Sequence, residues 1–303
     1  MILILGAGGL IGHALFRSLG ERFGAVQCTL HGTARHSLFA RSGVHESVDV
    51  RDSAAVRGLL ARLKPDVVLN CVGITKRKPE IDDLEQVIAV NSLFPHQLAR
   101  WAKEDGFRVI HFSTDCVFDG ALGNYTEESE TSARDVYGRT KALGELRYSH
   151  TLTIRSSFIG RELEGKSELL EWALSMRGQR VKGFERAWYS GVSTREMARV
   201  VGDIVENHPD LGGLVQLATE RPVPKCDLLR MIDIAFELGF ELEPDSAFET
   251  RPTLDGRKLR ETMNLELPDW PAMLAELAAQ RIYDDVAESP SGTASSSTSR
   301  RRN

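Results

Sequence analysis

The stretch that decides the fold is ILILGAGGLIG, which runs from Ile2 to Gly12. Four apolar residues are followed by glycines and then by a helical pattern through Leu15, Phe16 and Leu19. A strand, a glycine turn and a helix in this order let the backbone approach a pyrophosphate and place amide N–H groups at the helix N-terminus. We therefore predict a dinucleotide-binding turn, the alternative being a purely structural one, made by Gly6, Gly9, Leu10, Ile11 and Gly12.

Short apolar runs alternate with amphipathic helical stretches through the first half of the chain. The runs predict strands at residues 2–5, 26–30, 47–50, 67–69, 108–112 and 152–154. Helices are expected after Asp52, from about 82 to 105, and from 136 to 148. Parallel strands need crossover connections, so this alternation predicts an α/β fold of the Rossmann type, a doubly wound parallel sheet with helices on both faces.

The pattern changes after about residue 160, which suggests three parts of the chain. We expect residues 1–160 to form an NAD(P)-binding domain of the Rossmann type. Residues 161–288 are expected to form a smaller mixed α/β C-terminal substrate lobe, partly interleaved with the main sheet. Residues 289–303 are rich in Ser, Thr and Arg and poor in apolar residues, so we expect a disordered tail.

Composition excludes several classes of protein. With 38 basic and 43 acidic residues, the net charge of −5 does not favour nucleic-acid binding. The eight histidines and four cysteines show no metal-ligand spacing, so no metal site and no disulfide framework are predicted. No apolar run approaches the roughly 20 residues that span a bilayer, and no basic segment precedes the first strand. We expect a cytoplasmic protein without a signal peptide, partnered by neither nucleic acid nor membrane.

The residues after the second expected strand bear on the choice of cofactor. An acidic residue about 20 positions after the glycine turn commonly binds a free ribose 2′-hydroxyl, but residues 30–35 read LHGTAR. Arg35 is placed to meet a 2′-phosphate, which favours NADP(H) over NAD(H), the alternative being a surface residue in a basic loop. Asp49 could accept a hydrogen bond from an adenine amino group while Val50 packs on the ring, but a strand can also end in aspartate without any ligand.

Tyr137 and Lys141 stand four residues apart on an expected helix and therefore share one face. A nearby ammonium favours phenolate and lowers the pKa of a tyrosine, which suits proton transfer at a carbonyl or alcohol oxygen. Thr114 ends an expected strand at the sheet edge where ligands bind, so its hydroxyl could hold that oxygen. The alternatives are an exposed helical pair and a threonine that caps the following loop.

Together these segments resemble the extended short-chain dehydrogenases/reductases, and especially the dTDP-4-dehydrorhamnose reductase group. The similarity covers about residues 1–270. It rests on GAGGLIG at 6–12, NCVG at 70–73, VN at 90–91, STDCVFDG at 113–120 and YGRTKALGE at 137–145.

The resemblance implies a role for each of these segments. Thr114, Tyr137 and Lys141 would be catalytic, with Lys141 also binding the cofactor. Asn91 would have a structural or proton-relay role. The pocket for the nicotinamide ribose would be lined by Cys71, Val72 and Gly73.

The residues that the resemblance implies for the substrate depart from the pattern of the group. They are Asp115, Cys116, Ser157 and Phe158. Cys116 stands where the group commonly has tyrosine, and Phe158 where it has tryptophan. A thiol removes a long hydrogen-bonding side chain and phenylalanine removes an indole N–H donor. We therefore expect the chemistry of the group, with a different mode of sugar binding.

The activity implied by the resemblance is NADPH-dependent reduction of a 4-keto nucleotide-activated deoxysugar, in surface-polysaccharide sugar biosynthesis. Two alternatives stay open. One is an NAD(P)-dependent nucleotide-sugar epimerase or dehydratase, and the other is a non-catalytic nucleotide-binding regulatory subunit of the same fold. The expected partner is a nucleotide-sugar substrate, and a homodimer is one open oligomeric state.

Overall fold

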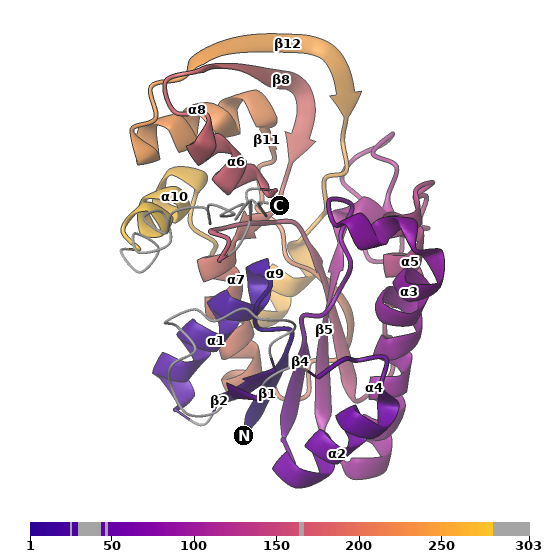
Figure 1. The fold of residues 1–303 in the computed structure, drawn as a ribbon. Coiled ribbons are helices and arrows are strands. Elements are labelled where there is room, and N and C mark those ends of the chain that lie inside the picture. Colours follow the sequence, from indigo (N-terminus) through magenta and orange to yellow (C-terminus); the bar gives the residue numbers. More distant parts are fainter. Residues whose placement is uncertain (25, 30–43, 46–47, 164–166, 281–303) are drawn as a thin grey trace, which may run out of the picture.

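The central sheet has seven parallel strands in the order β10-β6-β5-β4-β1-β2-β3 (Figure 1). The computed structural model describes residues 1–24, 26–29, 44–45, 48–163 and 167–280. Strand order reverses between β1 and β4, and in such sheets ligands bind outside the carboxyl ends of the strands at this point. The predicted doubly wound Rossmann-type fold is confirmed. The strands are β1 (Ile2–Leu5), β2 (Val26–Thr29), β3 (Val44–His45), β4 (Val67–Asn70), β5 (Arg108–Thr114), β6 (Thr151–Ser156) and β10 (Gly213–Gln216).

Helices cover both faces of this sheet (Figure 1). Successive residues of a strand point to opposite faces, so Ile2 and Ile4 enter the core beneath α1 and α7, whereas Leu3 and Leu5 enter the core beneath α2 and α4. Burial on both faces explains the continuous apolar run of β1 (ILIL). The helices are α1 (Leu10–Phe23), α2 (Ser53–Leu63), α3 (Leu84–Ile88), α4 (Phe94–Asp105), α5 (Val136–Leu143) and α7 (Thr194–Asn207).

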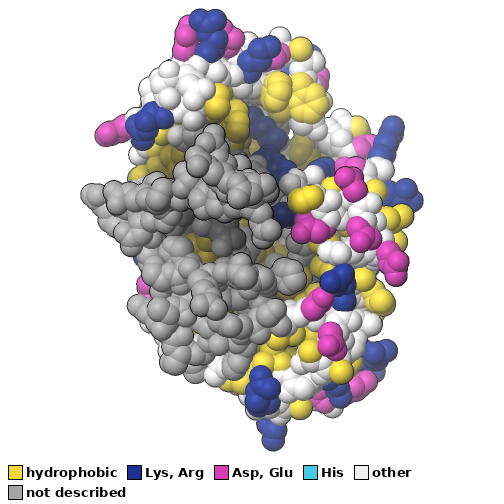
Figure 2. Space-filling model, viewed as in Figure 1, with side chains coloured by type: hydrophobic (Ala, Val, Ile, Leu, Met, Phe, Trp, Pro, Cys, Tyr) yellow, Lys and Arg dark blue, Asp and Glu magenta, His cyan; other side chains and the backbone are white. Residues whose placement is uncertain are grey.

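The second half of the chain builds a smaller lobe of helices and two small sheets. Strands β11-β8-β12 form one sheet and β7-β9 the other, while β10 and α7 belong to the main sheet and its covering layer. Figure 2 shows that the surface is hollowed between this lobe and the main sheet, and that Lys and Arg side chains lie in the hollow. The elements of this half are β7 (Phe158–Ile159), α6 (Leu169–Ser175), β8 (Arg180–Tyr189), β9 (Val192–Ser193), β11 (Val223–Pro224), α8 (Lys225–Phe236), β12 (Glu241–Thr250), α9 (Arg257–Met263) and α10 (Trp270–Ala278). Within the described ranges, no helix is long and apolar enough to cross a membrane.

The third strand does not lie where the sequence predicted it. It is β3 at Val44–His45, whereas Val48 and Asp49 are in irregular structure before α2. Asp49 bends the chain there: its carboxylate accepts from the backbone N–H of Arg51 at 2.9 Å, and its carbonyl accepts from that of Asp52 at 3.0 Å. Asp52 then caps α2, as predicted, by accepting from the amides of Ala54 and Ala55 at 3.0 Å.

The single helix predicted over 82–105 is interrupted by a π-helical turn at Ala89–Leu93, between α3 and α4. At this turn the backbone oxygen of Asn91 faces Gly144, the residue at which α5 ends. A Cβ atom at Gly144 would lie only 2.0 Å from that oxygen. This close packing leaves no room for a side chain at residue 144, where α5 ends; the helix predicted to continue to Tyr148 stops at Leu143.

Replacement of Gly144 by alanine is expected to lower the free energy of unfolding by about 1–3 kcal/mol, because the new methyl group overpacks a rigid backbone contact. Urea unfolding measures the effect. The matched control is Gly58→Ala in exposed α2, where a Cβ meets nothing within 4 Å; it should stabilise the protein by about 0.5–1 kcal/mol. Equal effects of the two substitutions would contradict this account of the packing.

Candidate active site

The predicted nucleotide turn has the compact backbone that glycine permits. Gly6 has φ +83°, and a Cβ at Gly12 would lie 2.2 Å from the Gly6 oxygen. The side chain of Thr29 accepts from the Gly6 amide at 3.1 Å and so ties the turn to β2. Gly9 stands at the N-cap of α1 with no side-chain cap, which leaves the first helical amides for a ligand. The turn therefore fits a dinucleotide pyrophosphate.

The predicted pocket residues after β4 lie against this turn. A Cβ at Gly6 would be 3.0 Å from a methyl of Val72 and 3.2 Å from the carbonyl carbon of Cys71. Asn91 fixes the same loop, because its side chain accepts from the Ile74 amide at 2.8 Å and donates to the Ile74 oxygen at 2.9 Å. The structure thus brings the glycine turn and the start of the 71–73 loop together, and gives Asn91 a structural role.

The residues predicted to bind the adenosine part of the cofactor are less favourably placed for that role. The carboxylate of Asp49 already binds the guanidinium of Arg51, at 2.6 Å from Nη2. Val50 is buried in the core beneath α2 rather than open to a ring. Arg35 and the tail at 289–303 lie outside the described residues. The binding roles of Asp49, Val50 and Arg35 stay predictions.

Lys141 lies on α5, and its side chain reaches the carboxyl end of β5. The residue is buried, with 5% of its surface exposed. Its amine donates to the Phe112 backbone oxygen at 2.7 Å and lies 3.3 Å from Nε2 of His111. Burial lowers the pKa of Lys141 to about 8, although the negative charge of Glu145 opposes that shift. The amine is therefore close to losing its proton near neutral pH.

Tyr137 is half-buried one turn before Lys141 on α5. Burial raises its pKa far above the usual value, Cys116 adds to the increase, and a hydrogen bond with Thr114 opposes it. The predicted lowering of this pKa by Lys141 was wrong, because desolvation of the phenol dominates and the lysine amine is bound to the backbone of β5. Tyr137 consequently holds its proton firmly and can act as a proton donor.

Thr114 has two roles in the structure. Its hydroxyl accepts from the Cys116 amide at 3.1 Å, which caps the turn that follows β5, and donates to the Asp115 carboxylate at 3.1 Å. The same hydroxyl is close enough to the Tyr137 phenol to oppose the rise of its pKa. The structure therefore brings the three predicted catalytic residues together and places Asp115 and Cys116 beside them.

Ser157 and Phe158 follow β6. The Ser157 oxygen accepts from the Val192 amide at 3.0 Å, which joins the end of β6 to the second lobe. The ring of Phe158 meets Phe112 edge-on, with centroids 6.3 Å apart. This packing holds the Phe158 ring against β5, while contact of Ser157 and Phe158 with a substrate stays a prediction.

Lys76 is a site residue that the sequence did not reveal. Its amine lies 5.8 Å from the centre of the Tyr137 ring and 2.9 Å from the Asp135 carboxylate that caps α5. Burial alone would lower the pKa of Lys76, but Cys116 and Asp135 raise it, so this ammonium stays charged. In the sequence it belongs to the run Lys76–Lys78, a pattern typical of a solvated loop.

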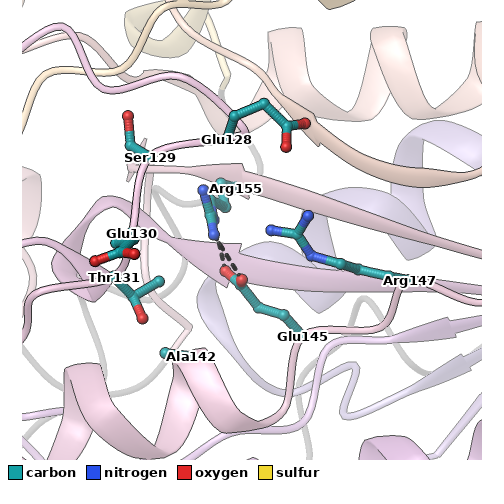
Figure 3. A pocket seen from close by; sticks show the side chains of 8 residues that line it. All are labelled: Glu128, Ser129, Glu130, Thr131, Ala142, Glu145, Arg147 and Arg155. Atoms are coloured by element: carbon teal, nitrogen blue, oxygen red, sulfur yellow. Dashed lines mark hydrogen bonds and ion pairs between the residues drawn. The ribbon is translucent and has the colours of Figure 1, made fainter.

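A polar cavity of about 490 Å³ lies next to α5, and Figure 3 shows the buried ion pair at its floor. Arg155 donates to Glu145 through Nε at 2.7 Å and Nη2 at 2.8 Å, and Ser113 donates to the same carboxylate at 2.7 Å. The side chains of Arg155 and Glu145 are 0% and 4% exposed. This cluster ties β5, β6 and the segment after α5 together beneath the catalytic residues. In the described part of the chain, no group of three or more His, Cys, Asp and Glu side chains could hold a metal ion.

Sequence and structure comparisons relate this chain to known proteins. The family model of the RmlD substrate binding domain matches residues 1–208. Methionine adenosyltransferase 2 subunit beta of Xenopus tropicalis is 32% identical over 150 residues, which cover 49% of this chain and 42% of that protein. The dTDP-4-dehydrorhamnose reductase of Streptomyces griseus is 34% identical over 144 residues, covering 47% and 43%. The matches thus span about two fifths of the length of these relatives.

Solved structures share the fold over most of the chain. A dTDP-4-dehydrorhamnose reductase from Bacillus anthracis in complex with NADP has a TM-score of 0.74 and 16% sequence identity. The alignment covers 91% of this chain and 97% of that one. Because the sequence identity is only 16%, this similarity is evidence for a shared fold alone.

Replacement of Arg155 by leucine is expected to lower the free energy of unfolding by about 3–5 kcal/mol, because it leaves the Glu145 carboxylate buried without its cation. The matched control is Arg180→Leu, which breaks an ion pair with Glu241 whose side chains are 61% and 66% exposed; this change should cost less than about 1 kcal/mol. Thermal unfolding of both variants measures the difference, and similar losses would contradict a buried structural pair.

Proposed function

This chain belongs to the RmlD substrate binding domain family, and we propose from that premise that it is an NADPH-dependent reductase of a 4-keto nucleotide-activated deoxysugar. The observation that carries the proposal is the assembly of Thr114, Tyr137 and Lys141 at the carboxyl edge of the sheet. The name of the Streptomyces griseus relative supports the substrate class. NADP in the Bacillus anthracis structure supports the cofactor.

The cofactor would bind across the carboxyl edge at the β1–β4 reversal. The glycine turn would hold its pyrophosphate on the free amides of Leu10 and Ile11, and Cys71, Val72 and Gly73 would border the nicotinamide ribose with Lys141. Bound NADPH supplies the hydride that reduces the carbonyl carbon. The preference for NADPH rests on Arg35, which lies beyond the described residues.

The chain's own groups would then handle the carbonyl oxygen. The Thr114 hydroxyl would turn its single proton from Asp115 to that oxygen, and Tyr137 would donate to it and give up its proton as negative charge develops there. The high pKa of Tyr137 keeps the proton in place until that charge appears. The ammonium of Lys141, one helical turn away, would hold the cofactor ribose beside this phenol.

The sugar would lie at Asp115, Cys116, Ser157 and Phe158. Cys116 has a smaller side chain than the tyrosine that the resemblance implies at this position, and the positive charge of Lys76 lies close to it. A substrate with an electronegative substituent near the reacting carbon would suit this site. The geometry therefore supports the reductase chemistry, with a mode of sugar binding that differs from that of the dTDP-4-dehydrorhamnose reductase group.

A second candidate is a nucleotide-binding subunit of another enzyme. The relative from Xenopus tropicalis, 32% identical over 150 residues, is named as a subunit, and this observation favours that candidate. The assembled proton donor and lysine favour the reductase. Co-purification with a partner enzyme, and no consumption of NADPH with keto-sugars, would support the subunit. An epimerase or dehydratase would bind the cofactor without net consumption.

Tyr137→Phe is expected to lower kcat by a factor of about 10²–10⁴, because it removes the proton donor and little else. The assay follows NADPH absorbance with dTDP-4-dehydro-6-deoxy-L-mannose. NADPH affinity, measured by fluorescence, should be retained. Tyr148→Phe, at an exposed tyrosine beyond α5, is the matched control and should keep full activity. An active Tyr137→Phe enzyme would refute the assignment of Tyr137 as donor.

The pH dependence follows from Lys141. Its amine is charged below a pKa of about 8 and neutral above it, so kcat/KM should be high on the acid side and fall as pH rises through about 8. The measurement is a profile from about pH 6 to pH 10 for the free enzyme. Lys141→Met should lose most of its activity, and its remaining kcat/KM should no longer fall as pH rises through about 8. A rate that stays constant through pH 9 would show that the charge on Lys141 is not needed.

A further inference from the structure

His111 is a buried titratable side chain that the proposed mechanism does not use. It lies on β5, is 0% exposed, and bridges two polar groups. Nε2 of its ring is 3.3 Å from the Lys141 amine, and Nδ1 is 3.1 Å from Nδ2 of Asn70 at the end of β4. The ring therefore connects the catalytic lysine to the neighbouring strand.

The hydrogen bonds of Asn70 decide which ring nitrogen of His111 carries the proton. The Val72 amide donates to Oδ1 of Asn70 at 3.3 Å, which fixes the orientation of the side-chain amide. Nδ2 of Asn70 then faces the ring, and since an amide nitrogen only donates, Nδ1 of His111 accepts. The proton of the neutral imidazole is consequently on Nε2.

The ring stays neutral, because burial holds the pKa of His111 well below its usual value and the charges of Lys141 and His96 act in the same direction. The Nε2–H group therefore points at the Lys141 amine. An ammonium has three donors and no acceptor, so the charged lysine places a donor against a donor, whereas a neutral amine can accept. This contact disfavours the charged form of Lys141.

The other groups around Lys141 act differently. Glu145 favours the charged amine, but its carboxylate is also shared with Arg155 and Ser113. Cys71 is close to the amine, and burial raises the pKa of its thiol so that it stays neutral. His111 is thus the polar side chain in direct contact with the amine, beside the Phe112 oxygen.

We propose that His111, held as its Nε2–H tautomer by Asn70, is a positioning residue that sets the protonation state of the Lys141 amine. The consequence for activity rests on the proposed reductase function: the pair would fix the pH at which the enzyme loses its rate. The protonation state itself can be measured without any turnover.

Two substitutions separate the parts of this arrangement. His111→Leu removes the opposing N–H donor. Asn70→Asp keeps the shape of the side chain, accepts a hydrogen bond from Nδ1–H and so leaves the Nε2 lone pair to accept from the ammonium. Both changes should stabilise charged Lys141. The control is His208→Gln, at a histidine near the exposed end of α7 that pairs with Asp203.

The experiment is NMR titration of the full chain with lysines labelled at Cε, where Lys141→Arg identifies the signal. The wild-type midpoint is expected near the pKa of about 8. In His111→Leu and Asn70→Asp it should rise by at least about one pH unit, a tenfold shift in the protonation equilibrium, and His208→Gln should match the wild type. Unchanged midpoints in the two variants would overturn the proposal.

Histidine labelled with ¹⁵N gives a second measurement on the unmodified chain. The wild-type His111 ring should show protonated Nε2 and no titration between about pH 5 and pH 9. A ring protonated on Nδ1 would overturn the proposal even if the variants fail to fold. A shift of the Lys141 midpoint in a chain without reductase activity would support this inference and reject the proposed function.

Discussion

The hydrogen bond from the Lys141 amine to the Phe112 backbone oxygen is the contact on which the site depends. It joins α5 to the carboxyl end of β5 inside the protein, where both residues are buried. Tyr137, one turn earlier on α5, is thereby placed at Thr114. At the C-terminal end of α5, Gly144 lets the π turn at 89–93 pack closely. A small displacement of α5 would separate the proton donor from the sheet edge where ligands bind.

Local sequence patterns were sufficient for the framework and for part of the site. The apolar runs, the glycine turn and the Asp52 cap are features that neighbouring residues determine, and they were predicted. The spacing of Tyr137 and Lys141 predicts that they share one helical face, and both lie on α5. The pKa of Tyr137 was predicted in the wrong direction, because the spacing shows the nearby cation but not the burial of the phenol.

The remaining parts of the site depend on contacts between distant segments. Asn70 and His111 are 41 residues apart and meet only because β4 and β5 pair in that register. In the sequence Asn70 is a single polar residue at the end of an apolar run, and His111 is one in the middle of another. Neither position indicates a partner. Lys76 belongs to a charged loop whose approach to Tyr137 follows from its ion pair with Asp135. The π turn lies just before Pro95, and this proline inside the predicted 82–105 helix is a local signal of the interruption that the sequence analysis did not use.

The central claim is that the site formed by Thr114, Tyr137 and Lys141 directs hydride from NADPH to the carbonyl carbon of a sugar. Transfer of deuterium from the cofactor to the sugar tests this claim most directly. The protein would be incubated with dTDP-4-dehydro-6-deoxy-L-mannose and NADPH carrying deuterium at the transferable position of the nicotinamide. The account predicts a sugar product with one deuterium on the former carbonyl carbon, formed in step with cofactor oxidation. A product without deuterium, or an unchanged sugar in the presence of bound NADPH, would contradict it.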